Sequence, residues 1–131
     1  MQQSLRTILL LAMISFALPK HEVKVEIPFN YEEAGKASYY ADALEGNLTA
    51  SGQVFSQNEL TAAHRTLPLG TKVLVFRPKT GQSVWVTIND RGPYVKSRII
   101  DLSRKAAEAL GLVHKGVGQV VIKAYLEPVQ P

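Results

Sequence analysis

From Gly35 onward the chain consists mostly of short apolar runs separated by glycine, proline, asparagine and aspartate. Runs of this length that are rich in β-branched residues predict strands rather than helices. Gly81, between two such runs, is suited to the positive φ of a tight turn. We expect six strands, at residues 36–40, 61–63, 72–76, 83–88, 98–102 and 119–125.

One short helix is expected between the last two strands, at residues 104–110. Ser103 is a suitable N-cap for it, and Gly111 stands where a helix commonly ends in a left-handed residue. Because open sheet edges pair readily with other chains, a small protein dominated by strands is expected to close its sheet. The pattern therefore predicts a mainly β fold, a small barrel with one short helix.

The first 17 residues have a different pattern. Arg6 gives a basic start, residues 8–14 are apolar, and residues 15–17 (SFA) form a small-x-small cleavage motif. This combination is typical of a secretory signal peptide, and the apolar run is shorter than the roughly 20 residues that a spanning helix needs. We expect residues 1–17 to be removed on export, leaving no stable membrane span. A buried N-terminal helix is the alternative.

The remainder divides into a linker, a domain and a tail. Residues 18–34 are expected to be a linker, with a short edge strand at 23–27 before Pro28 as an alternative. Residues 35–126 form one domain, and residues 127–131 form the tail. A domain near this size can bury a core of its own without staples.

The charge is mildly positive, with a formal value of +4 that becomes +3 when Arg6 is removed. A positive protein suits an anionic partner such as a wall polymer, a membrane surface or nucleic acid. The basic residues are scattered rather than clustered, and export argues against a nucleic acid. We therefore expect no nucleic-acid partner.

The chain has no cysteine, which excludes disulfides, thiolate metal sites, cysteine nucleophiles and a lipid anchor on cysteine. Its three histidines, His21, His64 and His114, are far apart in sequence and lack the spacing of zinc ligands. We expect no metal and no other cofactor.

Five segments, in a fixed order, resemble a known family. They are GKASYYA (35–41), TASGQVF (49–55), LTAAHRTLPLGTKVLV (60–75), NDRGPYVKSRIIDLSRKAAEALG (89–111) and GVGQVVIKAYL (116–126). Together they resemble the RlpA family, the septal-ring lytic transglycosylase-like proteins. The resemblance implies a six-stranded double-psi β-barrel, shared in outline with expansins and barwin-like proteins. It also implies peptidoglycan as ligand, cleavage of its glycan strands and a place in the periplasm or cell envelope.

Asp90 is the expected catalytic residue. It follows the strand at 83–88 and precedes a Gly-Pro turn, so a rigid support should present it to a cleft. A positioned carboxyl group can deliver the proton that glycosidic cleavage needs. The structural alternative is that Asp90 caps the turn and pairs with Arg91 or Arg98.

Asp101 alternates with Ile100 and Leu102, so its side chain should face away from theirs. We expect it to bond the helix start after Ser103 or to pair with an arginine, with support of the catalytic site as the alternative. Arg98 is assigned to the same supporting role.

His64 and Gln53 are expected to contact the glycan. A histidine can bind sugar hydroxyls or orient an acid, although a buried structural histidine is the alternative for His64. At Gln53 the family commonly carries a glutamate, and an amide cannot donate or accept a proton in catalysis. Asp42 and Glu45 lie nearby and could substitute, although loop carboxylates are usually only solvated.

Aromatic residues are the remaining candidates for glycan contact. Tyr94, beside the DRGP turn, is the best placed for stacking on a sugar, and Tyr40 and Arg91 are expected to assist. Tyr39 is a further candidate.

Trp85 is a candidate for glycan contact as well. It faces opposite to Val84 and Val86, so either it lies in the core and they lie outside or the reverse holds, and the core is expected because aromatic residues in small barrels are more often buried.

Two functions fit these residues. The first is an exported endolytic transglycosylase that cleaves peptidoglycan without water and leaves anhydro-muramyl ends. The second is a non-catalytic, expansin-like module that binds or loosens the wall, which Gln53 favours. Proteins of cell division or of the envelope are further partners to expect.

Overall fold

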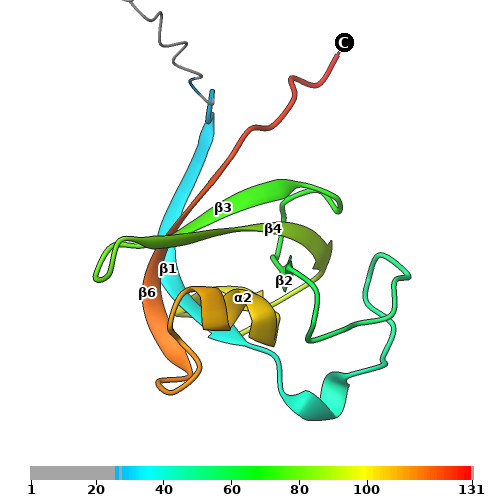
Figure 1. Cartoon of the computed structure of the whole chain (residues 1–131). Coiled ribbons are helices and arrows are strands. Elements are labelled where there is room, and N and C mark those ends of the chain that lie inside the picture. The colour runs from blue at the N-terminus through cyan, green and yellow to red at the C-terminus, as the bar shows by residue number, and fades with distance from the viewer. Residues whose placement is uncertain (1–25, 27, 131) are drawn as a thin grey trace, which may run out of the picture.

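The computed structural model describes residue 26 and residues 28–130. Six strands close into a barrel in the order β1-β5-β2-β4-β3-β6, so the predicted six-stranded barrel is confirmed (Figure 1). Along the chain the elements are β1 (Tyr31–Tyr39), the 3-10 turn η1 (Asp42–Leu44), β2 (Thr61–Ala63), β3 (Lys72–Arg77), β4 (Gln82–Asp90), β5 (Arg98–Leu102), α2 (Arg104–Ala109) and β6 (Val117–Ala124).

The barrel mixes parallel and antiparallel pairs. β1 runs parallel to β5 and β2 runs parallel to β4, whereas the other four pairs are antiparallel. β1 and β6 lie side by side along their whole length, and the long segment between β1 and β2 extends outward from the barrel (Figure 1). This closure leaves no exposed sheet edge among the six strands.

β1 starts earlier than the sequence indicated. It begins at Tyr31 rather than at residue 36, because the antiparallel pairing with β6 already starts at Tyr31 opposite Ala124. Residues 31–34, which we expected in a linker, therefore belong to the barrel. The expected signal peptide at 1–17 and the alternative strand at 23–27 fall on residues outside the described part, apart from Glu26.

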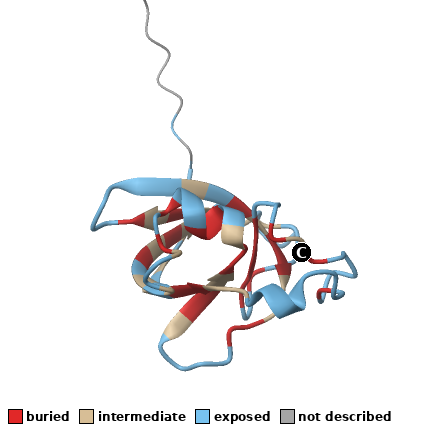
Figure 2. Cartoon of the chain, turned by 60° about the horizontal axis from the view of Figure 1, so that its bottom comes forward, coloured by how far each residue is buried: buried red, intermediate tan, exposed pale blue. Residues whose placement is uncertain are grey.

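Buried residues are spread over the strands of the barrel (Figure 2), and their apolar side chains form its core. Valine and isoleucine dominate this core, α2 adds two buried alanines, and the segment after it adds two leucines. The largest fully buried apolar side chains are Ile88, Ile100, Leu102, Leu110, Leu112, Ile122, Val73, Val75, Val86 and Val120. Burying a side chain of this kind contributes about 1.5–3 kcal/mol, so the core fixes the strand register on which the surface site depends.

α2 has the predicted caps. The Ser103 hydroxyl accepts a hydrogen bond from the backbone N–H of Ala106, and Gly111 has a φ of 67°. The buried Arg77 guanidinium donates to the carbonyls of Leu110 (2.9 Å) and Gly111 (3.3 Å). A cation at the negative end of a helix is favourable, and these bonds offset the cost of burying it.

Within the described residues, no helix has the length and apolar character needed to cross a membrane.

Candidate functional site

Asp90 ends β4, and three hydrogen-bond donors fix its carboxylate. The backbone N–H groups of Ala50 and Arg91 both donate to Oδ1 at 2.9 Å. The Tyr40 hydroxyl donates to Oδ2 at 2.6 Å. The donors come from the β1–β2 segment, from the turn after β4 and from the residue after β1. The half-buried carboxylate is thus held in a single orientation by separate parts of the chain.

Tyr40 is held as a donor in its protonated form. Its ring packs edge-on against Phe55, with centroids 4.4 Å apart. Burial, the hydrogen bond to Asp90 and the negative charges of Asp90 and Asp101 raise the pKa of Tyr40 far above its ordinary value. The hydroxyl therefore keeps its proton at any physiological pH.

Asp101 lies on the other side of β2 from Asp90. Ala63 pairs with Asp90 on one neighbouring strand and with Asp101 on the other. With adjacent strands about 4.8 Å apart, the two aspartate Cα atoms are separated by roughly 10 Å. Residues directly opposite in a sheet point to the same side, so both carboxylates face the same way across the small Ala63 side chain.

The contacts of Asp101 differ from those expected. Its Oδ1 accepts a hydrogen bond from the Ser38 hydroxyl, and the start of α2 is capped by Ser103 instead. None of the ion pairs among the described residues involves Asp101. The Nε of Arg98 is buried and has no partner there either. Asp101 thus adds a second carboxylate beside Tyr40 and does not bond the helix.

Gln53 is brought to the same end of β4. Its side-chain oxygen accepts a hydrogen bond from the amide of Asn89 at 3.3 Å, and the Asn89 carbonyl accepts from the Ser51 N–H at 3.1 Å. Gln53 is exposed, whereas Asn89 is only 3% exposed. A hollow of about 270 Å³ opens there, lined by Ser51, Gln53, Leu69, Gly70, Thr87, Ile88 and Asn89. The TASGQ loop is therefore tied to both Asn89 and Asp90.

His64 is buried and fully bonded within the protein. Its Nδ1 accepts from the backbone N–H groups of Thr66 (3.1 Å) and Leu67 (3.0 Å), so the ring proton is on Nε2. Nε2 lies 2.8 Å from Oε1 of Glu33 and donates to it. With 3% of the residue exposed, no ring nitrogen is free for a sugar hydroxyl. This corrects the expected contact: His64 supports the segment after β2.

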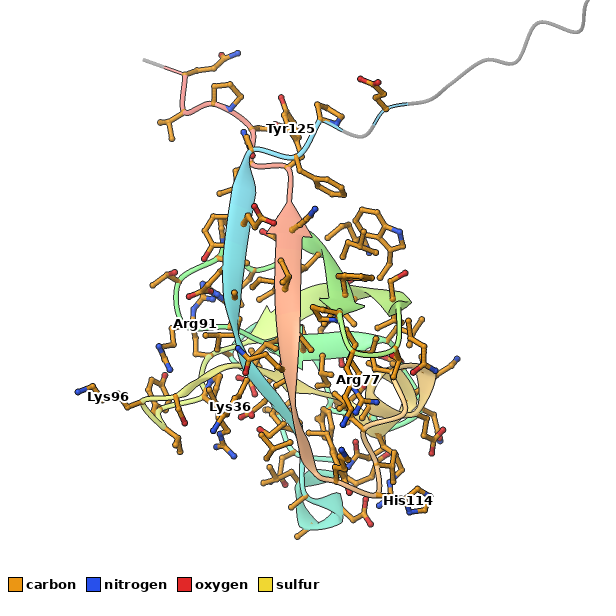
Figure 3. The ribbon with its side chains drawn as sticks, turned by 90° about the vertical axis from the view of Figure 1, so that its left-hand side faces the viewer. Lys36, Arg77, Arg91, Lys96, His114 and Tyr125 are labelled. Atoms are coloured by element: carbon orange, nitrogen blue, oxygen red, sulfur yellow. The ribbon has the colours of Figure 1, made fainter. Side chains whose placement is uncertain are left out.

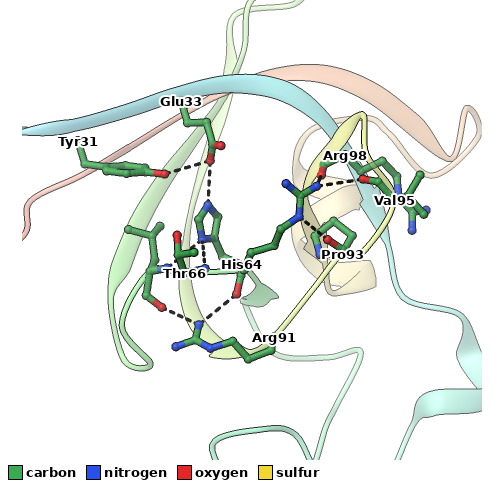
Figure 4. A network of polar contacts seen from close by, with 10 residues as sticks. Tyr31, Glu33, His64, Thr66, Arg91, Pro93, Val95 and Arg98 are labelled. Carbon is green, nitrogen blue, oxygen red and sulfur yellow. Dashed lines mark hydrogen bonds and ion pairs between the residues drawn. The ribbon is translucent and has the colours of Figure 1, made fainter.

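Arg91 faces away from Asp90. Its Nη1 donates to the carbonyls of His64 (3.1 Å) and Leu67 (2.7 Å), as Figure 4 shows. The described residues include no ion pair between Asp90 and Arg91 or Arg98. The alternative role for Asp90 was to cap the turn and to pair with an arginine. Of this, the structure shows only the hydrogen bond that the Arg91 backbone N–H donates to the carboxylate. Nη1 of Arg91 thus holds the His64 segment, and a glycan contact by the rest of this half-buried guanidinium stays a prediction.

Three residues of this network were missed by the sequence analysis. The Tyr31 hydroxyl donates to Glu33 at 3.1 Å, and burial together with the bond and charge of Glu33 raises the pKa of Tyr31 to about 12. Arg65 donates to the carbonyls of Pro93 (2.6 Å), Val95 (3.0 Å) and Arg98 (Figure 4). Residues 31–36 alternate between half-buried and exposed, as in a strand with one side facing the core. The sequence does not show this as apolar–polar alternation, because the polar Glu33 occupies one of the inward positions.

The aromatic candidates separate into different environments. Tyr94 is 82% exposed beside the DRGP turn and remains free for a ligand. The Tyr39 hydroxyl donates to the carbonyl of Val113 at 3.1 Å, away from Asp90. Trp85, which we expected in the core, lies on the outer side of β4 and is 42% exposed, because Val86 occupies the inward position.

No group of three or more potential metal ligands gathers among the described residues.

The closed mixed barrel and the carboxylates beside β2 define this molecule as a double-psi β-barrel protein with an acidic surface site.

Comparison with known proteins gives the family. Residues 32–122 match the family described as lytic transglycolase. Two relatives named as endolytic peptidoglycan transglycosylase RlpA, a probable one from Synechocystis and one from Pasteurella multocida, are 53% identical over 90 residues and 52% identical over 93 residues. The chain belongs to the RlpA family. The matched stretches cover 69% and 71% of this chain but only 28% and 32% of those relatives.

Solved structures show the same fold. The Streptomyces papain inhibitor matches with a TM-score of 0.60 and 25% identity, covering 77% of this chain and all of that one. The expansin of Clavibacter michiganensis matches with a TM-score of 0.57 and 22% identity, covering 77% of this chain and 54% of the expansin.

Proposed function

We propose that this protein is an exported endolytic peptidoglycan transglycosylase that cleaves glycan strands in the cell envelope and leaves anhydro-muramyl ends. Membership of the RlpA family and the names of its relatives support the substrate and the reaction type. The observation that carries the proposal is the Asp90 carboxylate, which three donors hold in one orientation while the neighbouring guanidinium points elsewhere.

In the proposed reaction Asp90 acts first as an acid and then as a base. The protonated carboxyl group gives its proton to the glycosidic oxygen, and the bond from that oxygen to the muramyl C1 breaks. A hydroxyl of the same muramyl sugar forms the new bond to C1 and returns its proton to Asp90. The attack is intramolecular and has a large effective concentration, so a second carboxylate is not needed to activate water.

The surrounding residues would bind and orient the strand. Tyr40 is the donor that stabilises the Asp90 carboxylate once its proton has left. Gln53 offers a free amide N–H₂ to a sugar, and the exposed ring of Tyr94 offers a stacking surface. Asp101 and Arg98 would support the site, and His64 would act through the segment that Arg91 also holds. Other envelope or division proteins are further proposed partners.

A second candidate is a non-catalytic, expansin-like module that binds or loosens the wall. The feature that favours it is Gln53, an amide where the family commonly carries a glutamate. An amide cannot move a proton in the reaction. A mechanism that needs two carboxylic acids on either side of the scissile bond would fail in this chain.

Binding and release of peptidoglycan, measured together, distinguish the two candidates. Purified peptidoglycan is incubated with the wild type, Asp90→Asn and Gln53→Glu, and both pelleted protein and soluble fragments are measured. The enzyme is supported if all three pellet and only Asp90→Asn releases nothing. If all three pellet equally and none releases fragments, the wall-binding module is the better account.

A further inference from the structure

A second hollow, of about 680 Å³, lies on the outer side of the barrel and is rich in exposed aromatic residues. Trp85 is 42% exposed and Tyr125 is 46% exposed. Phe29 packs against Trp85 with ring centroids 6.0 Å apart and an interplanar angle of 31°. Tyr125 follows the last residue of β6, at the opposite end of that strand from His114 (Figure 3). Residues 68–72, Leu126 and Glu127 complete the lining.

The core of the barrel is filled without these aromatic residues. The inward positions of β4 are already filled by Val86 and Ile88, which are almost completely buried. An outward tryptophan on a strand gains little from burial, and clustered exposed aromatic groups commonly mark a binding surface. The hollow is therefore a candidate site that the Asp90 chemistry does not explain.

The aromatic hollow adjoins the hollow beside Gln53. Leu69 and Gly70 line both of them. Side chains along β4 alternate as far as Ile88, so Trp85 and Thr87 share its outer side. The register with β2 then shifts at Asn89, which pairs Asp90 with Ala63. Trp85 lines the aromatic hollow, whereas Thr87 and Asn89 line the one beside Gln53. The outer side of β4 thus connects the aromatic hollow to the end of the strand that carries Asp90.

We propose that the hollow formed by Phe29, Trp85 and Tyr125 is a remote glycan subsite, in which a sugar ring stacks while the same strand is held for cleavage at Asp90. This inference rests on the proposed function. Trp85 precedes Asp90 by five residues, which is about 16 Å along an extended strand. A disaccharide at Asp90 is too short to reach the hollow, whereas a longer strand lying along β4 fills both positions.

The lining fits a sugar better than a peptide. A pyranose presents an apolar C–H face to an aromatic ring and hydroxyl groups at its edge. Here the rings are rimmed by polar groups, including Lys72, which donates to Thr87 at 2.5 Å, and Glu127. Because the rim carries one cation and one anion, its charge does not select the acidic stem peptides of the wall.

Tryptophan fluorescence tests the subsite directly, since Trp85 is the single tryptophan of the sequence. The probes are peptide-free glycan strands of graded length, and the full chain carries Asp90→Asn to prevent cleavage. We expect long strands to change the Trp85 emission and the disaccharide to leave it unchanged. In the same background Tyr125→Ala should weaken binding of long strands by about threefold to tenfold, the loss of one aromatic contact, and leave disaccharide binding unchanged.

The matched control is Val117→Ala, which removes an exposed apolar side chain at the other end of β6 and should change neither affinity. If long strands bind without any change in Trp85 emission, the remote subsite is refuted while the proposed function stands. An emission change that requires stem peptides and is absent with peptide-free strands would assign the hollow to a peptide. If no glycan of any length binds, the proposed function fails together with the subsite.

Discussion

The hydroxyl of Tyr40 donates a 2.6 Å hydrogen bond to Oδ2 of Asp90, joining the residue after β1 to the last residue of β4. These positions are 50 residues apart in sequence, and two strands, β5 and β2, lie between β1 and β4 in the barrel. The long Tyr40 side chain spans this separation and reaches Asp90. The bond places a protonated phenol beside the carboxylate that we propose to be catalytic. Tyr40 is therefore the residue through which the orientation of Asp90 is most directly tested.

Replacement of Tyr40 by phenylalanine should keep the fold and lower the cleavage rate. The ring contact with Phe55 is retained, whereas Asp90 loses one of its three donors. We expect a loss of about 1.5–3 kcal/mol in unfolding free energy, as for a hydrogen bond to a charged group. Tyr39→Phe is the control, because its hydroxyl bonds Val113 away from the site. Equal cleavage by the two variants would contradict a role for Tyr40 at Asp90.

Gln53→Glu tests whether one carboxyl group is sufficient. Asn89 can donate to a carboxylate as it does to the amide oxygen, so the loop should keep its position. If Asp90 is sufficient, the release of glycan fragments should change little. A large increase in release would show that the wild-type site lacks an acid. Gln53→Ala is the matched control, because it removes the hydrogen bond with Asn89 without adding a carboxyl group.

Strands β3, β4, β5 and β6 could be predicted from the sequence because valine, isoleucine and leucine supply most of their inward residues. The beginning of β1 could not, since its inward side carries the half-buried Glu33, which is bonded by His64, the residue after β2. The place of Asp90 at the end of a strand could be predicted from the apolar run before it. The environment of His64 could not, because backbone donors and a distant carboxylate occupy both ring nitrogens.

A structural role for His64 predicts a stability effect. His64→Ala leaves the N–H groups of Thr66 and Leu67 without an acceptor and removes one of the two donors to Glu33, the other being Tyr31. Each unsatisfied buried group costs about 1–3 kcal/mol, so we expect a total loss of about 2–4 kcal/mol. The measurement is the melting temperature, which should fall by roughly 10–30 °C for a domain of this size.

His64→Asn is the matched variant, since its side-chain oxygen can still accept from the Thr66 and Leu67 N–H groups. It should retain more stability than His64→Ala. If His64→Ala melted like the wild type but no longer cleaved glycan, direct contact between His64 and the substrate would be the better explanation.

The raised pKa of Tyr31 predicts that the folded protein loses stability in alkali. Burial and Glu33 raise the pKa of Tyr31 from 10.0 to about 12 in the folded protein. Below pH 10 the phenol is protonated in both states, and its contribution to stability is complete. Between pH 10 and 12 the unfolded chain ionises first, so stability falls as the pH rises. Thermal melting should show a smaller alkaline decline for Tyr31→Phe than for the wild type, whereas the exposed Tyr94→Phe should not differ from it.

The mass of the new glycan ends tests the central proposal most directly. Peptide-free glycan strands are incubated with the wild type and with Asp90→Asn, and the products are analysed by mass spectrometry. We predict that the wild type produces anhydro-muramyl ends, lighter by one water than ordinary reducing ends, and that Asp90→Asn reduces their formation by about 10²–10⁴-fold. Reducing ends from the wild type, or no fragments at all, would contradict the proposal of a lytic transglycosylase.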